Sequence, residues 1–197
     1  MTKHVPMLLA LAAALAGCGG GGGLGNPDEV ENPSQPAGQR LSFVYFQKCI
    51  DPILQTPLPI DINGVISVNS CAGGGCHDNT TGTGGALRVV AGAATVPLAD
   101  LSTPDLVRLT DMYKNFYSAQ GSTVPASPSQ SRLLTKPLVD GVLHGGGLIF
   151  ASPDDANAKR IRYWINRPMP EGQDEFSSAA ATMFTPADPA TGTCNDE

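Results

Sequence analysis

The chain has 197 residues, of which 41% are hydrophobic and 6% aromatic, enough for one domain of ordinary size plus a leader and tails. Its formal net charge of −6 and its lack of a basic cluster exclude nucleic acid as a partner, because binding to phosphates needs gathered Lys and Arg. The 23 Gly and 17 Pro predict many loops, and a chain of this composition often needs a disulfide or a cofactor to hold it together.

The N-terminus has the order of an export signal. A short polar start is followed by an apolar run over residues 5–16, which is shorter than the roughly 20 residues needed to cross a membrane. The run ends in L-A-G-C at Cys18, which resembles the lipobox of bacterial lipoproteins. The resemblance implies removal of residues 1–17 as a signal peptide and acylation of the Cys18 thiol. A plain signal peptide with a chance cysteine is the alternative.

Residues 18–39 form the next segment, a run of glycines followed by Pro, Asn and Gln. This composition cannot build a core and predicts a flexible tether. Gly19 stands where the inner-membrane lipoproteins of that family carry Asp, so the resemblance implies an anchor in the outer membrane, facing the periplasm. Export also places the chain in an oxidising compartment, where disulfides persist.

Residues 40–197 remain for the folded domain. Its first predicted element is a helix over residues 40–54, which places apolar residues on roughly one helical face, with Pro52 near the end. Residues 56–69 contain Pro, Asp and Asn and are predicted to form a loop.

Cysteine and histidine are few after the lipobox. They are Cys49, Cys71, Cys76, Cys194, His77 and His144. The informative feature is the run C-A-G-G-G-C-H over residues 71–77. Covalent haem attachment needs two thiols at the two vinyl positions and a histidine directly after the second thiol, usually spaced C-x-x-C-H. Here four residues separate the cysteines, and they are small enough to bulge without displacing either sulfur.

The sequence around this run resembles a group of bacterial cytochrome c domains. Their attachment site reads C-A-x-x-G-C-H-[DN] and follows an F/Y-x-x-x-x-x-P-I-L segment, and residues 71–78 and 46–54 match both patterns. G-G-A-L at residues 84–87 and the later Trp164 also fall where such domains have a turn and a terminal helix. The resemblance covers about residues 41–167.

The resemblance implies a fold, a cofactor and a set of ligands. The fold is mainly α, a cytochrome c-like helical domain with long loops and at most a short β-hairpin. The cofactor is one haem c, held covalently by Cys71 and Cys76, with His77 as the proximal iron ligand.

Three alternatives without haem remain for these residues. Cys71 and Cys76 could close a small disulfide loop, or Cys49 could pair with Cys71. Zinc could bind Cys71, Cys76, His77 and His144, although adjacent Cys76 and His77 rarely reach one tetrahedral ion.

Further elements are predicted downstream. Residues 86–90 could form a short strand. The run S-T-P-D at residues 102–105 is a typical helix start, with a hydroxyl N-cap and Pro in the first turn, and we expect this helix to reach about residue 119. A short helical segment is predicted over residues 131–136, and a longer helix from about residue 152 to residue 166.

The second iron ligand is expected in the loop before the last helix. In the domains that the chain resembles, this loop reads M-P-P after an S-x-L-L segment; here S-R-L-L begins at Ser131 and the loop carries His144. His144 is therefore the predicted distal ligand, and Met169 in R-P-M-P is the alternative. A pair of histidines would hold the reduction potential below that of a Met/His pair. Arg88 or Arg132 could pair with a haem propionate.

A C-terminal tail is expected from about residue 168. With haem on the other two thiols, Cys49 and Cys194 are left as a possible disulfide that ties this tail to the first helix. So long a closed loop contributes on the order of 4 kcal/mol.

The sequence thus predicts electron transfer by one haem c in an exported lipoprotein, with a redox partner protein in the cell envelope and no catalytic residues of its own. A haem-bearing subunit of an oxidoreductase is one alternative, but peroxidase chemistry needs an open iron position and a further acid or base. A haem-free, disulfide-stabilised surface or binding lipoprotein is the other.

Overall fold

A computed structural model describes residues 39–62 and 64–196. The predicted signal peptide 1–17, the lipid-bearing Cys18 and all but the last residue of the tether 18–39 lie outside the described residues. Among the helices that are described, none has the length and apolar character to cross a bilayer.

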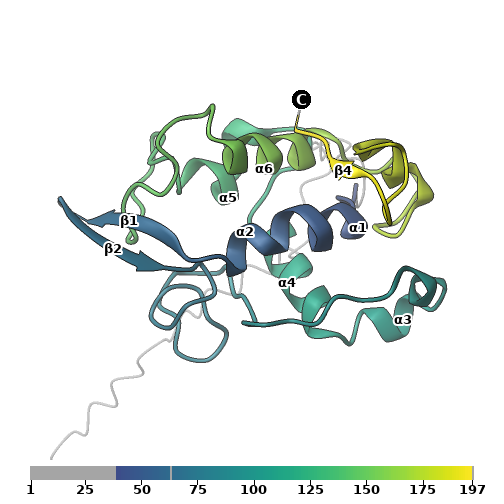
Figure 1. The fold of residues 1–197 in the computed structure, drawn as a ribbon, viewed down its shortest axis with the longest axis horizontal. Coiled ribbons are helices and arrows are strands. Elements are labelled where there is room, and N and C mark those ends of the chain that lie inside the picture. The colour runs from purple at the N-terminus through teal and green to yellow at the C-terminus, as the bar shows by residue number, and fades with distance from the viewer. Residues whose placement is uncertain (1–38, 63, 197) are drawn as a thin grey trace, which may run out of the picture. The chain divides into compact units, whose positions relative to one another are not determined.

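The domain begins with a first helical rod over residues 43–55, made of three consecutive helical pieces. These are α1 (Phe43–Tyr45), η1 (Phe46–Ile50), whose turns are π-helical, and α2 (Asp51–Gln55). The Ser42 hydroxyl caps the rod by accepting a hydrogen bond from the Tyr45 amide at 3.0 Å. The rod ends at Thr56, where the backbone becomes extended. It crosses the middle of the domain in Figure 1.

An antiparallel hairpin follows the rod. Strands β1 (Leu58–Ile62) and β2 (Val65–Asn69) pair with Ile60 opposite Ser67, and the hairpin projects from the domain in Figure 1. The sequence has Asn-Gly at residues 63–64, the dipeptide most typical of a two-residue hairpin turn, and Gly64 has a φ of 82°. The predicted loop over residues 56–69 is therefore a hairpin.

In the middle of the chain, two separate helices stand where a single helix was predicted to reach about residue 119. After the short 3-10 segment η2 (Leu98–Ser102), α3 (Pro104–Val107) ends after one turn and α4 (Asp111–Gln120) starts afresh. The break occurs because the Thr110 hydroxyl accepts a hydrogen bond from the Tyr113 amide at 3.1 Å and caps a new helix.

The C-terminal half adds short elements around one longer helix. In chain order they are η3 (Pro128–Gln130), α5 (Arg132–Thr135), α6 (Ala156–Asn166), η4 (Ser178–Met183), β3 (Phe184–Thr185) and β4 (Thr193–Cys194). The carboxylate of Asp155 caps α6 by accepting from the amides of Asn157 and Ala158.

Aromatic side chains form the centre of the core. Phe43, Phe46, Phe116 and Trp164 have no exposed surface. The ring of Phe116 lies edge-on to Phe43 and Phe46, with centroids 5.5 and 5.6 Å apart, and 6.2 Å from that of Trp164. The indole Nε1 of Trp164 donates to the Ser42 carbonyl at 2.9 Å, so α6 is fixed to the start of the rod.

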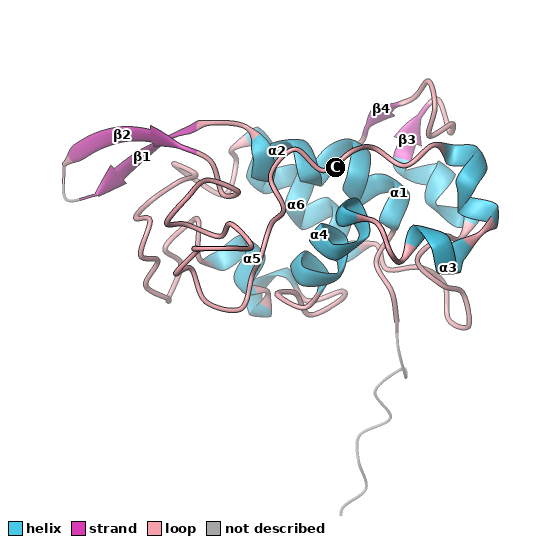
Figure 2. Cartoon of the chain, turned by 90° about the horizontal axis from the view of Figure 1, so that it is seen from below, coloured by secondary structure: helices cyan, strands magenta, loops and turns pink. Residues whose placement is uncertain are grey.

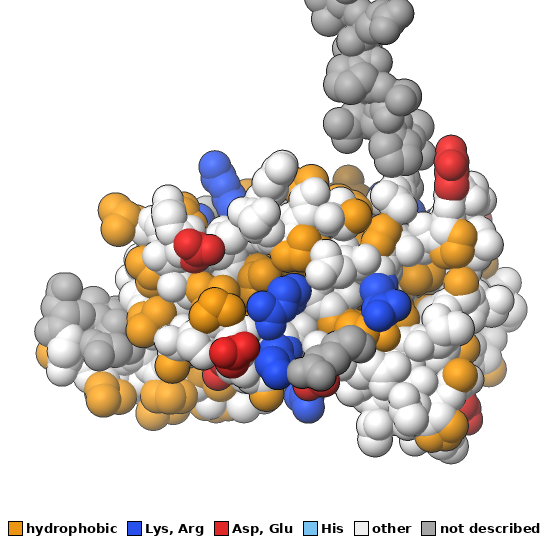
Figure 3. Space-filling view, turned by 90° about the horizontal axis from the view of Figure 1, so that it is seen from above, with side chains coloured by type: hydrophobic (Ala, Val, Ile, Leu, Met, Phe, Trp, Pro, Cys, Tyr) orange, Lys and Arg blue, Asp and Glu red, His pale blue; other side chains and the backbone are white. Residues whose placement is uncertain are grey.

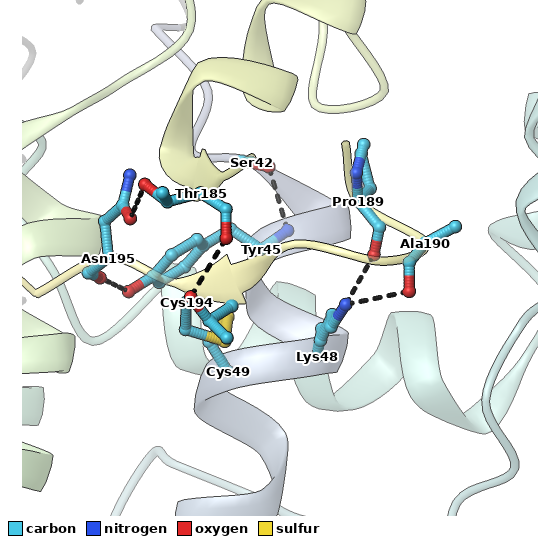
Figure 4. Close-up of a disulfide and its surroundings, with 10 residues drawn as sticks. Ser42, Tyr45, Lys48, Cys49, Thr185, Pro189, Ala190, Cys194 and Asn195 are labelled. Carbon is cyan, nitrogen blue, oxygen red and sulfur yellow. Dashed lines mark hydrogen bonds between the residues drawn. A yellow bond between two sulfur atoms is a disulfide. The ribbon is translucent and has the colours of Figure 1, made fainter. Parts of the chain in front are cut away.

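The predicted tail beyond residue 168 is packed against this core. Cys49 in the rod and Cys194 in β4 form a disulfide (Figure 4). The Lys48 ammonium donates to the carbonyls of Pro189 and Ala190, and the Tyr45 hydroxyl donates to the carbonyl of Asn195. The rod and the last strand are therefore joined by a covalent bond and by hydrogen bonds on both sides of it.

The predicted fold class is wrong. Helix covers 36% of the described chain and strand 10%, in six short α-helices and two small antiparallel pairs, so the fold is mixed and low in regular structure rather than a mainly α cytochrome c-like domain. Glycine and proline are the physical reason, because they interrupt hydrogen-bonded helices and favour turns. Figure 2 shows the resulting loops gathered beside α5 and the β1–β2 hairpin.

Candidate functional site

The C-A-G-G-G-C-H segment forms a compact loop directly after β2. The Ala72 amide donates to the Leu54 carbonyl at the end of the rod, at 3.0 Å, which fixes the loop to the core. The His77 amide donates to the Cys71 carbonyl at 2.9 Å and closes the four-residue spacer into a turn. Gly75 has a φ of 81° within this turn, a conformation that side-chain-bearing residues rarely adopt.

Both thiols of the segment are free and partly buried. The Asn69 side chain donates to the sulfur of Cys76 at 3.4 Å. Burial, with a smaller contribution from neighbouring Cys76, raises the pKa of the Cys71 thiol to about 11. Cys71 is therefore a neutral thiol at neutral pH. Because Cys49 is joined to Cys194, the alternative pairing of Cys49 with Cys71 is not formed.

The two histidines face each other across the site. Their ring centroids are 6.2 Å apart and their planes differ by 13°. The Nδ1 atom of His77 lies 3.3 Å from the Leu87 carbonyl, and that of His144 lies 2.9 Å from the Gly147 carbonyl. A carbonyl can only accept, so Nδ1 carries a proton in both rings and Nε2 is the nitrogen left to bind a metal when the ring is neutral.

The separation of the two ring centroids is of the size that one ion between two imidazoles would need. Two metal–nitrogen bonds of about 2 Å each, plus about 1.1 Å from each Nε2 to its ring centre, give a centroid separation of about 6 Å. Metal-bound histidine usually donates its other N–H to a backbone carbonyl or a carboxylate, which fixes the ring. The pair of histidines and the two free thiols thus contain the donor set that one covalently attached haem requires.

The electrostatic surroundings favour a neutral His77. Burial lowers the pKa of His77; the Leu87 carbonyl opposes this, while the charges of His144, Arg88 and Lys136 lower it further. A neutral imidazole is the form that ligates iron.

The loop after His77 fixes the orientation of its ring. The Val89 amide donates to the His77 carbonyl at 2.7 Å, and Asp78 and Val89 form an isolated β-bridge where a strand over residues 86–90 was predicted. A Cβ on Gly84 would clash with the His77 ring, so glycine is required there for the backbone to pass close to the imidazole.

Met169, the alternative distal ligand, is a core residue. Met169 is 3% exposed within the hydrophobic core, and its amide donates to the Arg40 carbonyl at 2.7 Å. Across residues 39–62 and 64–196, no group of three or more His, Cys, Asp and Glu is arranged to hold a metal ion, so the four-ligand zinc alternative is not assembled there.

Sequence reasoning missed the groups that fix the histidines. The carbonyls of Leu87 and Gly147 and the charge of Lys136 act on them through the folded chain. Backbone carbonyls carry no signal in the sequence. Only the glycines beside His77 and His144 indicated that backbone could come close to these rings.

Comparisons with protein-family models, with curated proteins and with solved structures find no match to this chain.

Proposed function

We propose that this protein transfers electrons through one haem c, held covalently by Cys71 and Cys76 and ligated by His77 and His144. The observation that carries the proposal is the facing of the two imidazoles, 6.2 Å apart, each with its Nδ1 on a backbone carbonyl. The two rings are therefore close enough to share one metal centre, and the two free thiols lie in the same loop as His77.

When bound, the haem iron supplies one-electron exchange. The chain's own residues hold the group and set its properties. With a histidine on each side, neither axial position is left for a small molecule, which favours an electron carrier over a peroxidase. The proposal names His144 rather than Met169 as the second ligand. Two histidines favour a lower reduction potential than a Met/His pair would give.

Apolar side chains on the His144 loop support the same proposal. Leu143, directly before His144, is 88% exposed, and Leu148 and Val139 in the same loop are also exposed. A large apolar side chain gains free energy when it is removed from water, roughly 2 kcal/mol for a leucine. A porphyrin bound beside His144 would cover part of this surface.

The cell-envelope setting is part of the proposal. Acylation of Cys18 would anchor the protein in the outer membrane, facing the periplasm, with the segment up to residue 39 as a tether. The partner would then be a redox protein of the cell envelope.

The test is an optical spectrum of the purified exported protein, oxidised and dithionite-reduced, followed by extraction with acid acetone. Sharp reduced bands, with the haem retained by the polypeptide, are expected. Replacing both Cys71 and Cys76 by Ala should release the haem to the solvent. A colourless protein from cells that attach haem to other cytochromes would contradict the proposal and favour a haem-free, disulfide-stabilised lipoprotein.

The distal ligand is tested by a matched pair of variants. His144→Ala should convert a low-spin spectrum to a high-spin one, because it removes one axial ligand. Met169→Leu keeps the volume of a core residue and should leave the spectrum unchanged. The opposite result would assign the distal position to Met169.

A further inference from the structure

A second site lies between the rod, α6 and the last strand. A cavity of about 560 Å³ opens there, within the range of small-molecule sites. Its walls are the rod from Lys48 to Thr56, the first half of α6, and residues 191–194. The Cys49–Cys194 disulfide and the side chains of Pro52 and Ile53 form its apolar part.

The charged side chains that line this cavity are both positive. They are Lys48 and Arg160, and no Asp or Glu is among the lining residues, although the chain as a whole carries a net charge of −6. In Figure 3 the face seen from above α6 shows Lys and Arg side chains gathered near its middle. A cationic cavity in an acidic protein concentrates anions.

Neither cation is neutralised by a carboxylate. Lys48 donates to two backbone carbonyls, those of Pro189 and Ala190. The nearby carboxylate of Asp188 is bonded instead to the Ala190 amide and the Thr191 hydroxyl, at 2.8 and 2.7 Å. The ion pairs found in the described part of the chain include neither Lys48 nor Arg160.

Arg160 also has an unsatisfied donor. Its Nε atom is buried and has no hydrogen-bond partner, the one such side-chain atom among the residues that the structure describes. A buried donor without a partner is costly, and native proteins seldom leave one unpaired. The guanidinium of Arg160 lines the cavity, and no carboxylate of the described chain pairs with its charge.

We propose that this cavity binds the phosphate group of a small phosphate ester or of a lipid headgroup. A phosphate carries up to two negative charges at neutral pH and therefore matches the two cations, whereas a carboxylate matches one. The planar guanidinium of Arg160 suits bidentate contact with phosphate oxygens, and Lys48 adds a point charge. The Asn157 carboxamide on the same wall adds further donors.

The test is calorimetric titration of the full exported chain with inorganic phosphate at low ionic strength. We expect saturable binding that Arg160→Gln weakens about tenfold, a loss typical of one charged hydrogen-bonding group. Arg162→Gln is the matched control, since it removes the same charge from the same helix and from a residue that bonds only the Pro153 carbonyl in the described chain. It should change the affinity less than about twofold.

Two further ligands sharpen the result. Acetate should bind at least about tenfold more weakly than phosphate, because it carries one charge. Monomeric dihexanoylphosphatidic acid should bind more tightly than inorganic phosphate if the natural ligand is a lipid headgroup, and equally if it is a soluble phosphate ester.

Two outcomes would overturn the proposal. The first is a lack of saturable phosphate binding up to about 20 mM in a protein whose circular dichroism shows it folded. The second is an equal loss of affinity in Arg160→Gln and Arg162→Gln, which would mean that overall charge rather than this cavity attracts the anion.

Discussion

The helical side of the domain and the two site loops are held together in different ways. On the helical side, the rod, α4 and α6 pack around buried aromatic rings, and a disulfide joins the rod to the last strand. The site loops, residues 70–90 and 136–150, consist mainly of turns and irregular backbone around the two histidines. The isolated bridge between Asp78 and Val89 lies in the first of them. Figure 2 shows this contrast between helices and loops directly.

The helical side therefore stabilises the domain, and the site loops carry the candidate functional residues. Aromatic packing and the disulfide stabilise the helical side whether or not a cofactor is present. The site loops leave Leu143 and Leu148 exposed and are held mainly by backbone hydrogen bonds, such as that from Ala72 to Leu54. We therefore expect changes on the helical side to alter the free energy of unfolding, and changes in the site loops to alter the binding of the proposed haem.

The largest expected effect is loss of the disulfide. Replacing both Cys49 and Cys194 by Ala should lower the free energy of unfolding by about 4–5 kcal/mol, from the chain-entropy relation for a loop of this length. Urea unfolding followed by the fluorescence of Trp164 measures it. The matched control is the haem-free double variant of Cys71 and Cys76, which should lose less than about 1 kcal/mol. Equal losses in the two double variants would show that the helical side and the site loops contribute equally to stability.

The next largest loss of stability is expected from the truncation of a core side chain. Phe116→Ala removes a fully buried ring that contacts Phe43, Phe46 and Trp164 and should cost about 4 kcal/mol. Leu143→Ala, in a site loop, should change the stability of the haem-free protein by less than about 0.5 kcal/mol, because that side chain is already exposed. A large cost at Leu143 without haem would show that the loop is packed in solution.

A glycine change tests the site loops alone. Gly84→Ala places a methyl group against the His77 ring and should shift the haem spectrum and cost about 1–2 kcal/mol by overpacking. Gly74→Ala is the control, since a Cβ there meets nothing within 4 Å. Identical spectra for both variants would mean that the His77 ring is not fixed by the Gly84 backbone.

The smallest expected effect is a pH dependence on the helical side. Burial raises the pKa of the Asp51 carboxyl, opposed by hydrogen bonds from Asn115 and Gln55. The folded state thus prefers the protonated acid, so this contribution to stability is full below the ordinary pKa and is lost as pH rises through the raised one. Asp51→Asn should therefore gain stability relative to the parent as pH rises toward neutral, in chemical denaturation at several pH values. A constant difference across that range would contradict it.

Local signals in the sequence predicted the position of several elements. The rod and α6 lie close to their predicted ranges, because a Ser or Asp cap and an apolar face define them within a few residues. The break between α3 and α4 was missed, since the apolar pattern runs through it while Leu106 and Leu109 are in fact exposed. The β1–β2 hairpin was missed although Asn-Gly marked its turn.

The predicted site depended on contacts that only the folded chain makes. The C-A-G-G-G-C-H run placed two thiols and His77 together by their spacing alone. The structure brings His144 opposite His77 from 67 positions further along the chain, and the carbonyls that fix both rings come from Leu87 and Gly147. No local pattern encodes such distant contacts, and for the same reason Lys136 was not foreseen.

The disulfide described above also decides which sulfurs are available for chemistry. Cys49 lies in the rod, whose last turn is hydrogen-bonded through Leu54 to the loop that contains Cys71, and as a thiol it would be a third reactive sulfur. Its bond to Cys194 removes both from reaction, and the described chain is left with two thiols, Cys71 and Cys76. The disulfide thus confines thiol chemistry in the described chain to the loop that follows β2.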